Sequence, residues 1–256
     1  ERWIEVLGGI ALLHENDSVP LRRVTSPIGV VAVAIANGGT LILGDHLGVE
    51  RSTDAGRSWQ VTLPTAIPPS LHFPFGGTLS VSRFEVARDA PRRLAAYVFE
   101  KTTGVPRDPG SPATYLSSDG GSTWTRRFDG WPALEFEPGT TAGLLFLTQS
   151  VGGTELRASE DDGATFVVRQ TFASADGYRD LAIDPVDPAT LFAATSLGAR
   201  VSHDGGVTWS PVPGGFRPWG RYRDALGSIF THPTEAGRIF AAPIEGGLFQ
   251  NRLSGF

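Results

Sequence analysis

An eight-residue pattern recurs four times along the chain and constrains its fold more than any other feature. The pattern, S-x-D-x-G-x-[ST]-[WF], occurs as STDAGRSW at 52–59, SSDGGSTW at 117–124, SEDDGATF at 159–166 and SHDGGVTW at 202–209. Five fixed positions that recur four times in 256 residues indicate a structural repeat rather than four independent sites.

The segments around each pattern also repeat. Before the fourth copy the chain reads LAIDPVDPATLFAATSLGARV, with three apolar stretches separated by Pro, Asp and Gly turns. A fourth apolar stretch follows each copy: WQVTL, WTRRF, FVVRQTF and WSPV. Four short strands with turn residues between them are typical of one blade of a β-propeller.

A fifth unit, SIFTHPTEAGRIFAAPIEGGLFQNR at 228–252, supplies only three strands. In the N-terminal RWIEVL at 2–7, Trp3 is expected to begin an outer strand, as the aromatics of WQVTL and WTRRF do. Pairing it beside Leu248 to Gln250 removes exposed strand edges. We therefore expect one all-β domain over residues 1–256: a five-bladed β-propeller of four-stranded antiparallel blades. In this interpretation residues 1–7 form the outer strand of the C-terminal blade, and a long linker carrying His14 and Arg22 follows.

Inside each pattern the residue types predict a self-contained turn. The aspartate can accept N–H groups of its own turn, the glycine two places on suits a positive φ, and the hydroxyls are expected to tie the turn to a neighbouring strand. The aromatic is expected to pack between blades. This interpretation makes four aspartates structural: Asp54, Asp119, Asp161 and Asp204. The alternative, calcium binding, has only one or two carboxylates per turn to support it.

This pattern resembles the Asp box, or BNR repeat, of sialidases, sortilin-type receptors, xyloglucan-degrading glycoside hydrolases and photosystem II assembly factors. The stretch IDPVDPATLFAATSLGARVSHDGGVTW at 183–209 is similar to blades of the last three groups. The resemblance covers nearly the whole chain at the level of blades. It implies the fold and leaves the function open, because the repeat serves unrelated activities.

Composition excludes several kinds of function. A net charge of −5 argues against broad nucleic-acid binding, and the absence of cysteine excludes thiol catalysis and disulfides. The five histidines show no metal-ligand spacing, and no apolar run is long enough to span a membrane. We expect no metal and no cofactor. The chain carries no methionine, which suggests a removed signal peptide and a periplasmic or secreted location.

In a propeller, the linkers between blades and the second-to-third strand loops share one rim, where ligands usually bind. The linkers here are rich in aromatic and arginine side chains. Candidate ligand-binding residues are His72, Phe73, Trp131, Tyr178, Arg179, Arg217, Trp219, Tyr222 and Arg223. The triplet YRD occurs at 178–180 and again at 222–224, where its Arg–Asp pair is either a binding fork or a structural salt bridge.

These features favour a monomeric, non-catalytic binding or assembly propeller that recognises a protein or a glycan through its rim. The alternative is a glycoside hydrolase, sialidase-like or xyloglucanase-like, that uses the rim carboxylates Asp45, Asp180 and Asp224. Carboxyl groups about 5–9.5 Å apart would favour hydrolysis, and dispersed, paired carboxylates would favour binding. The long loop at 101–110, with Lys101, Arg107 and Asp108, is either a lid or a tolerated insertion.

Overall fold

The computed structural model places the chain in two compact units, residues 1–131 and 132–256, and each is described by itself. The structure describes residues 2–7, 10–15, 20–25, 32–35, 40–45, 48–54, 56–64, 79–88, 90, 92–100, 111–130, 132–150, 153–213, 226–243 and 247–253. For the first four strands the description covers the backbone alone.

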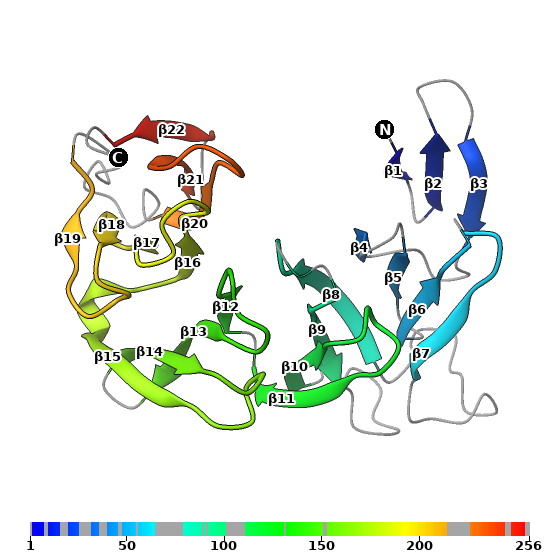
Figure 1. Cartoon of the computed structure of the whole chain (residues 1–256), viewed down its shortest axis with the longest axis horizontal. Helices are drawn as coiled ribbons and strands as arrows, with labels where there is room; N and C mark the ends of the chain where they lie inside the picture. The colour runs from blue at the N-terminus through cyan, green and yellow to red at the C-terminus, as the bar shows by residue number, and fades with distance from the viewer. Residues whose placement is uncertain are drawn as a thin grey trace. The chain divides into compact units, whose positions relative to one another are not determined.

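The first unit contains three antiparallel sheets whose strands follow one another along the chain (Figure 1). Its first sheet is formed by β1 (Arg2–Leu7), β2 (Ile10–Glu15) and β3 (Pro20–Thr25). The second contains β4 (Ala32–Ile35), β5 (Leu41–Asp45), β6 (Gly48–Ser52) and β7 (Gln60–Pro64). The third contains β8 (Leu79–Val86), β9 (Leu94–Glu100), β10 (Ser111–Ser117) and β11 (Thr125–Asp129).

The second unit also contains three antiparallel sheets. The first is formed by β12 (Ala133–Phe136), β13 (Leu144–Ser150), β14 (Gly153–Ser159) and β15 (Val167–Ala173), and a short 3₁₀ helix, η3 (Ser174–Asp176), follows it. The next contains β16 (Asp180–Ile183), β17 (Leu191–Thr195), β18 (Gly198–Ser202) and β19 (Ser210–Pro211). The last contains β20 (Leu226–Thr231), β21 (Arg238–Pro243) and β22 (Phe249–Arg252).

The predicted all-β, antiparallel, four-stranded architecture is therefore found, but five blades and ring closure are not confirmed. The described strands form six sheets, and β1 pairs with β2 from Trp3 opposite His14 to Leu7 opposite Ile10. The segment expected to be a long linker contains β2 and β3. Only two residues separate β1 from β2 in the sequence, so their pairing costs less loop-closure entropy than a pairing of the two chain ends.

The core of the first unit lies between the sheets β4–β7 and β8–β11. Ile42 and Val49 from one sheet are buried against Val81 and Val98 of the other. Gly44 of β5 faces β8 so closely that a Cβ there would lie 2.5 Å from Val81 Cγ1. Glycine is therefore required by the close approach of the two sheets.

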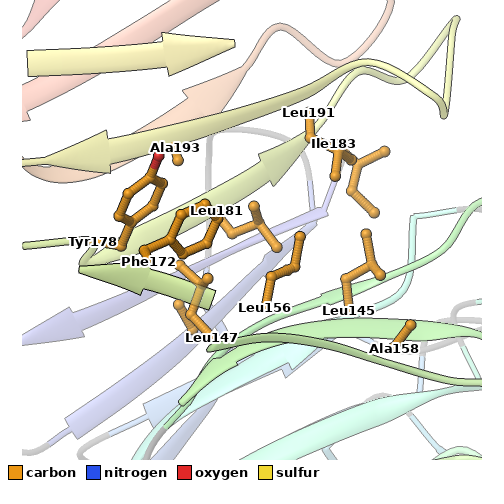
Figure 2. Packing of buried hydrophobic residues seen from close by; sticks show 11 residues of the cluster. Leu145, Leu147, Leu156, Ala158, Phe172, Tyr178, Leu181, Ile183, Leu191 and Ala193 are labelled. Atoms are coloured by element: carbon orange, nitrogen blue, oxygen red, sulfur yellow. The ribbon is translucent and has the colours of Figure 1, made fainter. Parts of the chain in front are cut away.

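In the second unit, each sheet packs its apolar face against the next. Figure 2 shows Leu145, Leu147 and Leu156 of one sheet directed towards Leu181 and Leu191 of the following one. A second cluster, which includes Phe192, Val201, Ile229 and Ile239, joins that sheet to β20–β22. This sheet-on-sheet sequence fixes which turns of successive sheets lie together.

Candidate functional site

The first Asp box shows how the four repeated turns are held. Asp54 Oδ1 accepts the backbone N–H of Ser58 at 2.8 Å, and Asp54 Oδ2 accepts the Ser58 hydroxyl at 2.6 Å. Ser52 Oγ donates to Asp54 Oδ1 and accepts the N–H of Gly56, each at 2.8 Å. Gly56 has a φ of 81°. The same bonds recur around Asp119, Asp161 and Asp204.

These hydrogen bonds act on the acidity of the carboxyl groups. The Thr165 hydroxyl and backbone N–H lower the pKa of Asp161 to about 2, and the corresponding groups of Thr208 lower the pKa of Asp204 to about 2. Hydrogen bonds from Ser58 likewise hold the pKa of Asp54 far below its ordinary value. A carboxylate stabilised in this way stays ionised at neutral pH and is a poor proton donor.

The Ser and Thr hydroxyls of the boxes were expected to reach a neighbouring strand, and this expectation was wrong. The Ser58 and Thr123 hydroxyls donate to the aspartate of their own turn, so each of these turns is closed by its own side chains. In the second box the aromatic side chain makes this connection instead. Trp124 Nε1 donates to Thr62 Oγ1 of β7 at 3.2 Å and to Gly121 O at 3.2 Å.

The opposite ends of the strands form the rim predicted for ligand binding. Gly153 pairs with Ala173 at the rim end of β14 and β15, and Ser159 begins the box at the other end. Ser196, in the β17–β18 turn, donates its N–H to Asp176 O at 3.2 Å. The linker after β15 and the second-to-third strand turn of the next sheet therefore lie together, as the repeat predicted.

Tyr178 was expected on the open rim, but its side chain is only 3% exposed. Its ring stacks on Phe172 with centroids 3.7 Å apart, and Trp209 meets it edge-on at 5.9 Å. Burial raises the pKa of the Tyr178 hydroxyl to about 12. Tyr178 thus fills the space between two sheets, because β15 brings Phe172 directly beneath it (Figure 2).

The other two residues of this YRD triplet remain at the rim. Asp180 Oδ2 accepts the backbone N–H of Ile229 in β20 at 3.0 Å, so this carboxylate joins two sheets. The Arg179 side chain is exposed, and its backbone N–H donates to Ala194 O at 2.9 Å. Close by, Leu197 in the β17–β18 turn is 55% exposed.

The remaining candidates lie at or beyond the edges of the described segments. Asp45 ends β5, with its side chain outside the description. Outside the described residues lie His72, Phe73, Trp131, Arg217, Trp219, Tyr222, Arg223 and Asp224. Lys101, Arg107 and Asp108 of the long loop lie outside them too.

A charged cluster next to the long loop was missed by sequence reasoning. Glu100, at the end of β9, accepts the Tyr115 hydroxyl at 2.5 Å and three hydrogen bonds from Arg126 Nε and Nη2 at 3.0–3.1 Å. Arg126 also pairs with Asp129 at 2.7 Å. Burial and the Glu100 carboxylate raise the pKa of Tyr115 to about 12, so the hydroxyl stays a hydrogen-bond donor. Strand register alone brings these residues together, which no local motif could reveal.

Two properties of the described part of the chain concern metal ions and membranes. There, no three His, Asp or Glu side chains gather in a way that could hold a metal ion. No helix in that part is long and apolar enough to cross a membrane.

The comparisons with known proteins support the repeat and the fold. Residues 200–211 match the BNR/Asp-box repeat model. No curated protein sequence matches the chain. Among solved structures, the GH74 xyloglucanase from Xanthomonas campestris is similar with a TM-score of 0.60 and 16% identity, over 95% of this chain and 40% of that one. The chain therefore spans about two fifths of the xyloglucanase chain.

Two further solved structures show the same fold. YCF48 from Cyanidioschyzon merolae is 18% identical with a TM-score of 0.52, over 89% of this chain and 68% of that one. A chain in a crystal structure of a nidogen/laminin complex is 10% identical with a TM-score of 0.51, over 94% of this chain and 85% of that one. At these identities the similarity concerns the fold alone.

Proposed function

We propose that this chain, whose repeats and sheets are those of a BNR-type β-propeller, is a non-catalytic binding or assembly module. Its partner is a protein or a glycan, recognised by the aromatic and arginine side chains of the rim. The rim residues proposed to bind it are His72, Phe73, Trp131, Arg179, Arg217, Trp219, Tyr222 and Arg223. The proposed location is periplasmic or extracellular.

The observation that carries this proposal is the structural hydrogen bond that the Asp180 carboxylate makes. Its carboxylate, the one candidate acid whose contacts are described, accepts the N–H of Ile229 and joins two sheets. The same end of the strands presents an exposed arginine, Arg179, and an exposed leucine, Leu197. An exposed cation and an exposed apolar side chain at one end of the sheet suit recognition of a carboxylate or an amphipathic surface better than acid–base chemistry.

Glycoside hydrolysis is the second candidate, and the similarity in fold to the GH74 xyloglucanase favours it. Hydrolysis needs a second carboxylate to work with a proton donor across the scissile bond. In this chain Asp45 and Asp224 are the remaining candidates for that pair. Exposed tryptophans such as Trp219 would then act as platforms for sugar rings.

One experiment separates the two functions. The chain is immobilised and exposed to a glycan array and to an envelope fraction, and xyloglucan and sialosides are assayed in parallel for release of reducing ends. The binding function predicts capture without turnover, and the double variant Arg179→Ala/Leu197→Ser reduces capture while the melting temperature stays unchanged. Turnover that Asp224→Asn abolishes, with folding intact, would overturn the proposal in favour of hydrolysis.

The matched control is Tyr178→Phe. Its ring is buried against Phe172, so removal of the hydroxyl should leave capture unchanged. If Tyr178→Phe reduced capture as much as the rim double variant does, the loss would reflect disturbed packing rather than a rim contact.

A further inference from the structure

The end of the first unit opposite the rim carries a group of arginines that the box geometry does not need. Gly120, in the second Asp box, donates its N–H to Arg92 O at 2.8 Å and accepts a hydrogen bond from Arg51 Nε at 2.8 Å. Arg51 Nη2 lies 3.9 Å from the place of a Cβ at Gly120. Arg88 lies in the same β8–β9 turn as Arg92, and both are exposed. We call Arg51, Arg88 and Arg92 the arginine patch.

The repeat allows the patch to be compared with equivalent positions in other sheets. After the inner strand, one backbone N–H donates to the carbonyl six residues further on, at 2.8–3.0 Å, in four turns: Ala87 to Arg93, Glu137 to Gly143, Asp184 to Thr190 and His232 to Arg238. The residue after the donor is Arg88 in the first unit and proline in the other three turns. The residue before the acceptor is Arg92 in the first unit and Ala142, Ala189 or Gly237 in the others. The turn thus forms without either arginine.

The bond from Arg51 to a box carbonyl also has an equivalent. In the second unit Arg169 Nη1 donates to Gly205 O at 3.2 Å, but Arg169 Nη2 pairs with Glu137 at 3.1 Å. Within the described part of the chain, no carboxylate pairs with any member of the arginine patch. The two arginines lie on different strands, Arg51 on β6 and Arg169 on β15, but each binds the carbonyl of the equivalent box glycine. Among the described residues, the arginine of the second unit is paired with a carboxylate and Arg51 is not.

We infer that the arginine patch is a docking surface for an acidic segment of a polypeptide partner. Planar guanidinium groups bind carboxylates through paired hydrogen bonds, and three of them around one turn match a short run of Asp or Glu. The net charge of −5 disfavours a long polyanion such as a nucleic acid, because the rest of the surface repels it. This surface lies at the box end of the strands and is independent of the proposed rim function.

The test measures binding of a fluorescein-labelled hexaglutamate peptide to the full chain by fluorescence anisotropy. Arg88→Glu/Arg92→Glu should weaken binding about tenfold or more, and Arg92→Ala, which introduces the residue type of Ala142 and Ala189, should weaken it less. Because exposed charges are screened within about 10 Å at 0.1 M salt, binding by the unmodified chain should also weaken steeply as salt is added. Arg252→Glu, a charge reversal at an exposed arginine of the second unit, is the matched control and should leave binding unchanged.

Several results would overturn the inference. One is equal peptide affinity for the unmodified chain and the double variant, with both folded by circular dichroism. Tighter binding of duplex DNA or inorganic polyphosphate than of the peptide would replace the acidic polypeptide by a phosphate ligand. Self-association at low salt that the double variant abolishes, without peptide binding, would assign the patch to a second copy of the chain.

Discussion

Asp184 accepts the backbone N–H of Gly237 at 2.7 Å through its Oδ2 atom, although the two residues lie 53 positions apart in the chain. Its Oδ1 atom accepts the N–H groups of Val186 and Asp187 at 2.9 and 3.1 Å. One buried carboxylate therefore holds its own turn and also the β20–β21 turn of the next sheet. Together with Asp180 at the other end of β16, it ties the two sheets at both ends of the strand.

Replacement of Asp184 by alanine should lower the free energy of unfolding by about 3 kcal/mol, because one buried and two part-buried N–H donors lose a charged acceptor. Asp184→Asn should lower the free energy of unfolding by nearly as much, although the side chain keeps its shape. Both Asp184 oxygens accept N–H groups, and in asparagine the side-chain NH₂ group would replace one of these acceptors with a donor. Val186→Ala, in the same turn but 61% exposed, is the control and should change the free energy by no more than about 0.5 kcal/mol. Urea denaturation measures all three, and equal losses for Asp184→Ala and Val186→Ala would contradict the role of the carboxylate.

His232 occupies the position of Asp184 in the last sheet. Its Nδ1 accepts the N–H groups of Thr234 and Glu235 at 3.3 and 3.2 Å, so an imidazole nitrogen takes the place of a carboxylate oxygen. His232→Asp should therefore keep the turn and the melting temperature, whereas His232→Ala should lower stability by about 1 kcal/mol. Thermal denaturation of the two variants at neutral pH checks this, and an equal loss in both would show that the turn needs no acceptor.

The repeat explains how much of this fold could be predicted from the sequence. The boxes, their turns and the two ends of each sheet depend on local spacing, so the pattern around Asp54 or Asp204 was sufficient to predict them. The strands β2 and β3 were missed because residues 10–25 carry no box that would mark them as part of a repeat unit. Closure beside Leu248 was an inference from missing strands rather than from residues that recognise one another.

The candidate site was harder to predict because neighbouring residues of one motif have different structural roles. Tyr178 and Arg179 are neighbours in one YRD triplet, yet the first is buried and the second exposed. Their burial differs because Phe172 in β15 stacks on the Tyr178 ring, a tertiary contact that the triplet itself does not encode. The Glu100–Tyr115–Arg126 cluster depends in the same way on strand register, which cannot be predicted from a local motif.

The Asp boxes predict how stability depends on pH. The pKa values of Asp161 and Asp204 fall from the ordinary 3.8 to about 2 in the folded state, so folding favours the ionised form. The stabilisation is therefore fully present above about pH 5 and is lost as the pH falls from about 4 to 2. Melting temperatures measured from pH 7 to pH 2 should fall in that window.

Asp161→Asn provides the control for this pH dependence, because it cannot ionise. The variant should melt below the unmodified chain at neutral pH, and the difference should shrink towards pH 2, where Asp161 itself becomes protonated. A difference in melting temperature that stays constant across the range would show that the charge of Asp161 does not stabilise its turn.

Gly44 and Val81 allow a direct test of sheet packing in the first unit. A methyl group added by Gly44→Ala would meet Val81 Cγ1 at 2.5 Å, so this substitution should cost about 1–3 kcal/mol of stability. Val81→Ala removes buried methyl groups and should also destabilise the protein by about 1–3 kcal/mol. In the double variant the methyl group added at position 44 enters the space that the valine methyl groups leave, so the loss of stability should be smaller than the sum of the two single losses. Urea denaturation of the four proteins measures this coupling. Strictly additive losses would mean that β5 and β8 do not approach closely at this point.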